Sequence, residues 1–379
     1  MPGALQSRPV TIVGGGVAGL TAALALQGRG AHVTVLERAP ALTEIGAGLQ
    51  LSPNAMRVLD ALGLGAAIDA ASLPSGAVVL CRASGVPVVR LDFARHRPGA
   101  RFRLIHRARL IAVLEQAARS AGVAIRLDQA VATPPDVPLL IGADGLHSRI
   151  RAVLNGREVP FFTGQTAWRA VIADGDAAPQ AQVFMGPGRH LVSYPLAGGL
   201  RNIVAVLETR DWQDEGWSRA DDPANLRAAF SGFGGAVPGW LARIDTVHVW
   251  GLFRHEVASR WQDGRMAILG DAAHPTLPFM AQGACMAIED AWVLAACLDA
   301  TPDQNAALSR YEALRKPRAA RIVAAANANA RNYHLTGARR LVAHAALRIG
   351  GTVAPGAILS RFDWIYDFDP VAGGPSPSP

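Results

Sequence analysis

The chain opens with apolar residues whose spacing changes twice within the first forty positions. Residues 9–13 read PVTIV, a run rich in β-branched residues, and a glycine turn leads from it into the alanine-rich stretch VAGLTAALALQ. A Gly-Arg-Gly stop then precedes a second such run, AHVTVLE, over residues 31–37. A short apolar run, a helical stretch and another short apolar run predict one βαβ unit with parallel strands.

The pattern changes near residue 161 and returns near residue 250. Between them, short runs such as AWRAVIA, QVFMGPGRHLVSYPL and RNIVAVLE are broken by Gly, Pro and Asp, which is typical of an antiparallel sheet. After residue 250 the α/β pattern resumes at MAILGDAA, and long helical stretches continue to about Ile349.

These patterns predict an α/β fold with an insertion. We expect a Rossmann-like nucleotide-binding domain with an inserted, mostly antiparallel β-sheet domain for substrate, followed by a C-terminal helical region. The expected boundaries are 1–160 and 250–300 for the first domain, 161–249 for the sheet domain, 301–370 for the helices and 371–379 for a disordered tail. Part of 70–105, which contains GAVVLCRASGVPVVRLDF, is expected to join the inserted sheet.

Composition narrows the possible functions mainly by exclusion. The formal net charge of +7 comes from arginines scattered along the chain, without the dense run expected for a nucleic-acid or membrane patch. The three cysteines, Cys81, Cys285 and Cys297, have no metal-ligand spacing and fit a reducing compartment. We expect a cytoplasmic protein with no metal, no nucleic-acid partner and no stable membrane association.

The first glycine turn has the spacing of a dinucleotide-binding loop. Gly14, Gly16 and Gly19 lie between a strand and a helix, where missing β-carbons let the backbone approach a pyrophosphate at the helix N-terminus. Val17 and Ala18 belong to the same loop. Glu37 ends the second strand, where an acid can bind ribose hydroxyls and repel the extra phosphate of NADP.

Two further turns follow apolar strands. LLIGADGLHSRIRAVL places Asp144 and Gly145 at the end of one strand, with Ser148 and Arg151 beyond it. The stretch ILGDAAHPTLPFMAQGACMAIEDAW places Gly270 and Asp271 at the end of another, before a helix that begins at Gly283. Either turn alone could be an ordinary strand end.

Together, in order and spacing, the three motifs resemble those of the group A flavoprotein monooxygenases with the para-hydroxybenzoate hydroxylase fold. The resemblance runs from Val10 to about Asp369. Within that group, the segments GAGLQLSPNA, HRARL, GDAAHPTLPFMAQGACMAIEDA and FDWIYDFD are most similar to salicylate hydroxylase-like enzymes, including 3-hydroxybenzoate and 6-hydroxynicotinate monooxygenases.

The resemblance implies non-covalent FAD, a transient NADH or NADPH donor, O2 as co-substrate, and hydroxylation of a small aromatic or heteroaromatic compound through a flavin C4a-hydroperoxide, by a monomer or homodimer. No second strand-embedded glycine motif offers the donor a domain of its own. The expected FAD-binding residues are Gly14, Gly16, Val17, Ala18, Gly19, Glu37, Arg38, Gln50, Arg107, Asp144, Asp271, Gln282, Gly283 and Ala284.

Three residues are the candidates for direct catalytic contacts: Gln50, Asn202 and Pro278. Gln50 stands where relatives of 6-hydroxynicotinate monooxygenase carry a His, and a Gln cannot accept a proton at neutral pH. Asn202 is the second residue of RNIVAVLE, where relatives have substrate-binding aromatics, while Pro278 lies with Phe279 and Met280 beside the expected flavin ring.

Four residues of the inserted sheet could supply a base or a carboxylate partner: Arg169, His190, Tyr194 and Arg201. His274 is expected to be structural. Two alternatives stay open. One is a same-fold oxygenase for a larger quinone or polyketide precursor, and the other is a flavin-binding redox protein without hydroxylase turnover.

Overall fold

The first sheet is entirely parallel and carries the nucleotide-binding motifs at its strand ends. The computed structural model describes residues 3–42, 47–175, 178–209, 212 and 218–372. The sheet order is β16-β9-β1-β2-β8, and every described pairing within it is parallel. Its strands are β1 (Pro9–Val13), β2 (His32–Leu36), β8 (Ala124–Arg126), β9 (Leu140–Gly142) and β16 (Met266–Ile268).

Helices cover this sheet and hide its apolar strands. Helix α9 (Gly283–Ala300) packs on α1 (Val17–Gln27), on α2 (Pro53–Ala61) and on α10 (Gln304–Tyr333), while α5 (Arg107–Ser120) also packs on α1. Helix α1 packs against both α9 and α5, and apolar residues occupy all of its faces. Its Leu20 and Leu26 are fully buried. Short helices α3 (Gly65–Ala71) and α6 (Arg149–Asn155) complete the domain.

The second sheet has eight strands in the order β14-β15-β10-β13-β12-β11-β5-β6. They are β14 (Ser218–Asp221), β15 (Val247–Arg254), β10 (Phe161–Ala173), β13 (Leu200–Glu208), β12 (Arg189–Leu196), β11 (Gln180–Gly186), β5 (Ala77–Arg82) and β6 (Pro87–Asp92). Neighbours are antiparallel except for β11 and β5, so two strands from before residue 100 extend the inserted sheet. Helices α7 (Pro223–Ala229) and α8 (Val237–Ala242) bury one face, with Trp168, Phe184 and Trp240 at its core.

A small antiparallel sheet joins the two larger parts. Its strands, in spatial order, are β3 (Gly48–Leu51), β7 (Arg103–His106) and β4 (Ser72–Pro74). The amide of Gly48 donates to the side-chain oxygen of Asn202 on β13 at 2.7 Å. A Cβ at Gly48 would meet the Cβ of Asn202 at 3.0 Å, so only glycine allows β3 to approach the large sheet this closely.

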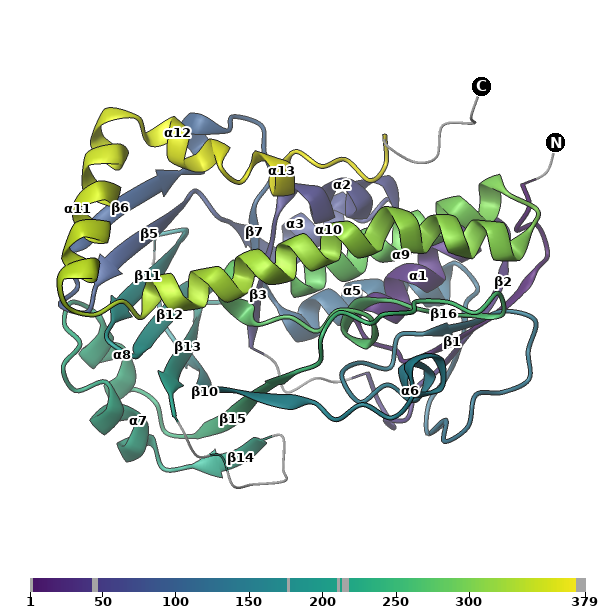
Figure 1. The fold of residues 1–379 in the computed structure, drawn as a ribbon, viewed down its shortest axis with the longest axis horizontal. Coiled ribbons are helices and arrows are strands. Elements are labelled where there is room, and N and C mark those ends of the chain that lie inside the picture. Colours follow the sequence, from purple (N-terminus) through teal and green to yellow (C-terminus); the bar gives the residue numbers. More distant parts are fainter. Residues whose placement is uncertain (1–2, 43–46, 176–177, 210–211, 213–217, 373–379) are drawn as a thin grey trace.

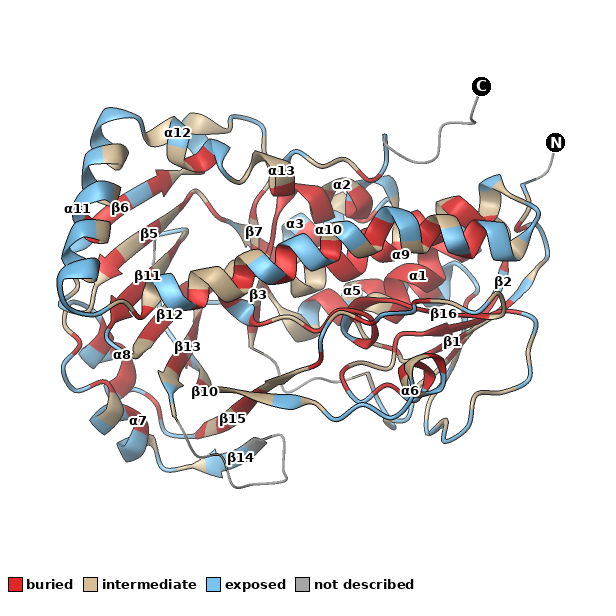
Figure 2. Ribbon diagram, viewed as in Figure 1, coloured by how far each residue is buried: buried red, intermediate tan, exposed pale blue. Residues whose placement is uncertain are grey.

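The C-terminal helices tie the molecule together along its long axis (Figure 1). Helix α10 (Gln304–Tyr333) runs from the parallel sheet to the eight-stranded sheet, and α11 (Gly337–Val353), α12 (Pro355–Ser360) and α13 (Asp363–Tyr366) return over β6 and α4 (Phe93–His96). Buried residues line the contact between α9 and α10, whereas few residues of α11 are buried (Figure 2).

The predicted fold class is confirmed: an α/β chain with a parallel sheet, a mostly antiparallel second sheet and C-terminal helices. Residues 373–379 of the expected tail lie outside the described residues. In the part of the chain that the structure describes, no helix is long and apolar enough to cross a membrane.

Candidate active site

The glycine loop leaves an open space in front of helix α1. At Gly14, with φ 107°, and at Gly19, an added Cβ would collide with backbone oxygens, those of Ala143 and Gly14 respectively, so these two glycines serve close packing. An added Cβ at Gly16 would meet nothing within 4 Å. The space at Gly16 is therefore available to a ligand, and the α1 N-terminus faces it with unpaired amides that favour an anion.

Glu37 closes the loop from the neighbouring strand. Its carboxylate accepts hydrogen bonds from the amides of Gly15 at 2.6 Å and Ala39 at 2.9 Å. A carboxylate has about four acceptor positions, so these two bonds fix its orientation and leave capacity for a ribose hydroxyl. Arg38, the next residue, is exposed.

Asp271 lies on the same wall of the cleft as the glycine loop, in the short helix η1 (Gly270–Ala272) that follows β16. Gly270 has φ 60°, and an added Cβ would press on Ala18 at 3.0 Å, so glycine is required for the chain to turn beneath α1. Asp271 is exposed and lines the cleft, and no described residue forms a hydrogen bond or ion pair with its carboxylate. That carboxylate is free to accept hydrogen bonds from a ligand.

Helix α9 starts on the same wall. Gly283, Ala284 and Ala287 line the cleft, so the amides of the first turn of an 18-residue helix are directed to it. Such amides stabilise negative charge by about 0.3–1 kcal/mol, or about 2 kcal/mol when partly buried.

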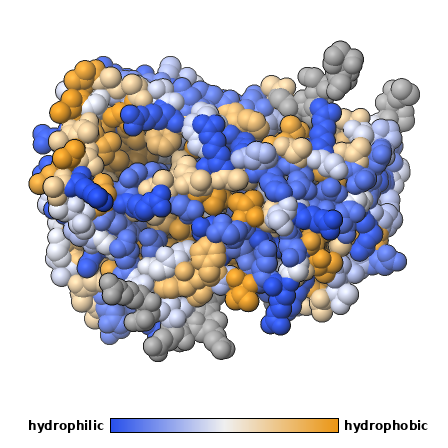
Figure 3. Space-filling view, in the orientation of Figure 1, coloured by the Kyte–Doolittle hydropathy of each residue, from blue (hydrophilic) through white to orange (hydrophobic). Residues whose placement is uncertain are grey.

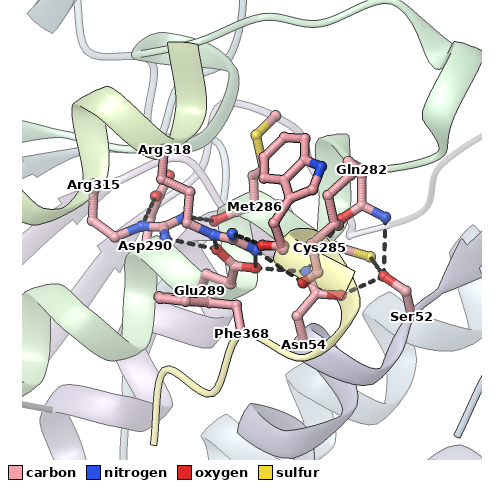
Figure 4. Close-up of polar contacts among 12 residues, drawn as sticks. Ser52, Asn54, Gln282, Cys285, Met286, Glu289, Asp290, Arg315, Arg318 and Phe368 are labelled. Atoms are coloured by element: carbon pink, nitrogen blue, oxygen red, sulfur yellow. Dashed lines mark hydrogen bonds and ion pairs between the residues drawn. The ribbon is translucent and has the colours of Figure 1, made fainter. Parts of the chain in front are cut away.

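A buried charged network holds α9 and the Asp271 turn in place. Arg315 donates to Asp290 at 2.8 Å and pairs with Glu289 at 2.6 Å (Figure 4). Asp290 also accepts from the amide of Gly270 at 3.1 Å and from His274. The side chains of His274, Glu289, Asp290 and Arg315 are all fully buried. His274 and the Arg315 charge hold the pKa of Asp290 at about 2 despite its burial. His274 has the structural place expected for it.

Three of the predicted site residues have their side chains in protein contacts. Asp144 accepts from the Ser148 hydroxyl at 2.6 Å and from the amide of Arg149 at 2.7 Å, which fixes the N-terminus of α6, although its neighbours Ala143 and Gly145 line the cleft. Gln282 is buried and donates to Ser52 at 3.0 Å. Asn202 is buried on Gly48 and is not among the residues that line the cleft.

The cleft itself has a volume of about 280 Å³ and lies between the two sheets. One wall carries the glycine loop, Asp271 and the start of α9. The other comes from the large sheet, and the ends are formed by the small sheet and the turn before α9. Residues lining these other parts include Gln50, Arg107, Arg169, His190, Tyr194, Val204, Val206, Pro278 and Phe279. The predicted residues Gln50, Arg107 and Pro278 are thus brought together with three of the four candidates on the sheet.

The fourth, Arg201, has a different environment. It pairs with Asp174, donates to Ser193 at 3.0 Å and lies over the Trp240 ring at 4.4 Å, on the face that α8 covers. Its charge is compensated within the sheet domain. Arg169, by contrast, lines the cleft beside Tyr194 and stacks on Trp250 at 5.4 Å. Burial, together with nearby Arg107, lowers the pKa of Arg169, so an anionic ligand would be favoured there.

His190 is linked to solvent by a chain of hydrogen bonds. Its Nδ1 lies 2.7 Å from Nε2 of His334, and Nδ1 of His334 lies 2.7 Å from a carboxylate oxygen of Glu208. His190 and His334 are buried, whereas the Glu208 side chain is 52% exposed. Burial, and for His190 also the second imidazole, lowers the pKa of both histidines.

This chain fixes the tautomer of each ring. The carboxylate of Glu208 can only accept, so His334 donates from Nδ1 and, being neutral, offers a lone pair at Nε2. His190 must therefore donate from Nδ1, which leaves its own Nε2 as the acceptor nitrogen. Phe279 and Tyr333 contact the His190 ring, each with ring centroids 5.2 Å apart, and help to exclude water from it.

Comparison with known proteins gives this cleft its context. A family model described as an FAD binding domain matches residues 7–135 and 136–326. The chain is 35% identical to 3-hydroxybenzoate 6-hydroxylase of Polaromonas naphthalenivorans, over 95% of this chain and 96% of that protein. It is 34% identical to 3-amino-4-hydroxybenzoate 2-monooxygenase of Streptomyces platensis, over 96% of both. The chain belongs to the FAD-dependent aromatic monooxygenases.

The fold of the chain agrees with that of solved structures. A salicylate hydroxylase solved as a substrate complex has a TM-score of 0.81 at 24% identity, covering 98% of this chain and 100% of that one. The predicted recognition, enzyme class and cofactor are confirmed: this monooxygenase uses FAD, with NAD(P)H and O2 as the co-substrates of its family.

The residues present fit FAD. The open space at Gly16 suits a pyrophosphate, the Asp271 carboxylate, which has no partner among the described residues, suits the ribityl hydroxyls, and the α9 N-terminus suits the electron-rich edge of the flavin. The sequence did not identify His334 and Glu208 as candidate site residues. They lie 144 and 18 residues from His190, and no local spacing connects them before the sheet and α10 are assembled.

Proposed function

We propose that this enzyme hydroxylates an aromatic or heteroaromatic ring that already carries a hydroxyl group, and that His190 accepts the proton of that hydroxyl. The observation that carries the proposal is the oriented chain from His190 through His334 to Glu208, which begins at the cleft and ends in water. When bound, FAD supplies the redox chemistry that takes electrons from NAD(P)H and activates O2.

The protein residues have distinct roles in this proposal. His190 takes the hydroxyl proton at Nε2 and passes the proton on its Nδ1 to His334, which passes its own Nδ1 proton to Glu208. A ring becomes more nucleophilic as its hydroxyl loses a proton, and a positioned general base contributes about 10²–10⁴-fold. Neutral imidazoles are required, and their burial keeps them neutral at pH 7.

Arg169 and Tyr194 orient the ring. Arg169 offers the cleft a cation that a substrate carboxylate or a developing phenolate would complement, and a hydrogen bond to a charged group contributes about 1.5–3 kcal/mol. Burial raises the pKa of Tyr194, so its hydroxyl stays protonated and can donate. Gln50 and Pro278 line the cleft and hold the edges of the ring.

The related enzymes support the same substrate class. The two relatives named above act, by their names, on hydroxybenzoates. We propose a substrate of this hydroxylated kind for the present enzyme.

The test is a screen of phenols, hydroxybenzoates and hydroxypyridines with the FAD-loaded enzyme. NADH and NADPH oxidation is followed in air, with mass spectrometry of the products. The proposal predicts that at least one hydroxylated ring accelerates NAD(P)H oxidation and gains one oxygen atom. Ligand-independent oxidation that yields only hydrogen peroxide with every compound would instead favour a flavin redox protein without hydroxylase turnover.

A further inference from the structure

A second, larger chamber lies next to the cleft. Its volume is about 510 Å³, against about 280 Å³ for the cleft. Strands β5 and β6 form its floor with Val78, Leu80, Val89 and Leu91, and α11 forms its roof. Arg361 is the one Asp, Glu, Lys or Arg among the described residues that line it, and Asn329, Asn332 and His344 add polar groups from α10 and α11. The floor of the chamber, which is apolar, is therefore suited to a hydrocarbon group.

Helix α11 is poorly packed for a helix of its length. Of its 17 residues only His344 is buried, and the helix approaches the sheet closely at one point, where an added Cβ on Gly351 would meet Val89 at 2.6 Å. Apolar residues gather at this end of the molecule (Figure 3). Protein interiors are normally filled to crystal-like density, whereas a dry apolar cavity binds apolar molecules. Packing at interior density would not leave a space of this size under α11, and its apolar floor suits an apolar ligand.

The chamber and the cleft share a wall. Gln50, Val192 and the segment Pro278–Ala281 contribute residues to both cavities. This segment is a single 3₁₀ turn, η2 (Pro278–Met280), which ends at Ala281 with φ 52°. The wall between a ring in the cleft and the chamber is therefore one turn thick.

We propose that the chamber is the subsite for an apolar substituent of the aromatic substrate. The ring lies in the cleft beside His190, and an alkyl or prenyl-like chain passes Gln50 and Pro278 into the space between β5, β6 and α11. This inference rests on the proposed function for the position of the ring. It extends that function from small hydroxylated rings to rings with a hydrocarbon chain.

The test uses calorimetric titration of the FAD-loaded enzyme with phenol, 4-ethylphenol, 4-butylphenol and 4-hexylphenol. Each buried methylene contributes about 0.8 kcal/mol, so the dissociation constant is expected to fall about fourfold per added methylene. Ala343→Trp places an indole in the chamber from α11 and is expected to abolish this dependence on chain length while phenol binds as before.

The matched control is Ala345→Trp, because Ala345 is exposed on the same helix and does not line the chamber. It should retain the wild-type dependence on chain length. Leu347→Trp is a second filling variant if Ala343→Trp does not fold, and FAD content and circular dichroism establish the fold of each variant.

The outcomes separate the two proposals. Equal affinity for phenol and 4-hexylphenol in the wild type, or a gain with chain length that survives in the filling variants, overturns the chamber as a subsite and leaves the proposed function standing. Absence of binding for every phenol, short or long, contradicts the ring site itself and the chamber proposal with it.

Discussion

Two carboxylates are expected to act by different means: Asp271, which lines the cleft, and Glu208, at the solvent end of the chain from His190. Asp271 has no described protein partner and so is available to the cofactor, while Glu208 ends the hydrogen-bond chain from His190 and is half exposed to water. A substitution of Asp271 should affect FAD binding, whereas a substitution of Glu208 should affect proton transfer. Substitutions at these two positions can therefore be told apart by what they change.

Asp271→Ala is expected to weaken FAD binding by about 10- to 150-fold, because a hydrogen bond to a charged group contributes about 1.5–3 kcal/mol. The change is measured by fluorescence titration of the apoenzyme with FAD. Asp136→Ala is the control, since Asp136 is exposed in the same domain. An unchanged FAD dissociation constant for Asp271→Ala would remove Asp271 from the cofactor site.

Glu208→Gln is expected to lower kcat by about 10- to 100-fold with FAD content unchanged, because glutamine can accept the His334 hydrogen bond but cannot take a proton. Wild-type kcat should fall as pH drops through the pKa of the histidines, which burial places below the ordinary value. Formate should partly restore Glu208→Ala. Asp245→Asn, a change at an exposed carboxylate of the same domain, should behave as wild type. Wild-type kinetics in both Glu208 variants would rule out the relay.

At the scale of elements, α9 and α10 position the cofactor wall through buried charges. Arg315 on α10 compensates both Glu289 and Asp290 on α9, and Asp290 in turn holds Gly270 and His274. Buried ion pairs add little net stability when complete, but removing one partner leaves an uncompensated charge. The orientation of α9 toward the cleft thus depends on α10.

Arg315→Met is expected to destabilise the protein by about 3–5 kcal/mol in denaturant unfolding, whereas Arg331→Met, an exposed change on the same helix, should have little effect.

Acid should weaken the same network by protonating Asp290. The pKa of Asp290 is about 2 when folded and about 4 when unfolded, so its stabilising contribution is complete above about pH 4 and is lost as pH falls toward 2. If the wild type loses stability already above pH 5, groups other than Asp290 must be responsible for that loss.

The elements also show what sequence could and could not predict. The parallel strands and the glycine loop were predictable because local periodicity and turn chemistry specify them. The side-chain contacts of Asn202 and Gln282 were not, because each contacts a residue far away in sequence, Gly48 or Ser52. The His190 relay was beyond prediction for the same reason: it requires β12, β13 and the end of α10 to meet.

At the scale of the whole molecule, the cleft lies between the two large sheets that α10 links, and one turn separates the cleft from the chamber. Phe279 lies in that turn, is buried and contacts the His190 ring. The turn both excludes water from the reacting ring and limits access from the chamber. Sealing of this kind decides how much of the consumed NAD(P)H leads to product.

Phe279→Ala is expected to leave FAD content and NAD(P)H oxidation largely intact while peroxide rises and hydroxylated product falls, because water gains access to the ring. The ratio of product to NAD(P)H consumed is the measurement. Loss of FAD with an unchanged ratio in the remaining holoenzyme would show that the turn supports the cofactor and does not seal the substrate site.

Transfer of a proton from the ring hydroxyl to His190 can be tested by comparing a phenol with its methyl ether. The best phenolic substrate from the screen and its methyl ether are each incubated with holoenzyme, NAD(P)H and ¹⁸O2, and the products are analysed by mass spectrometry. If this proton transfer is required, the hydroxylated phenol contains one ¹⁸O atom, while the bound ether, which has no proton to give, yields peroxide and no labelled product. Equal ¹⁸O incorporation into the ether would contradict that requirement.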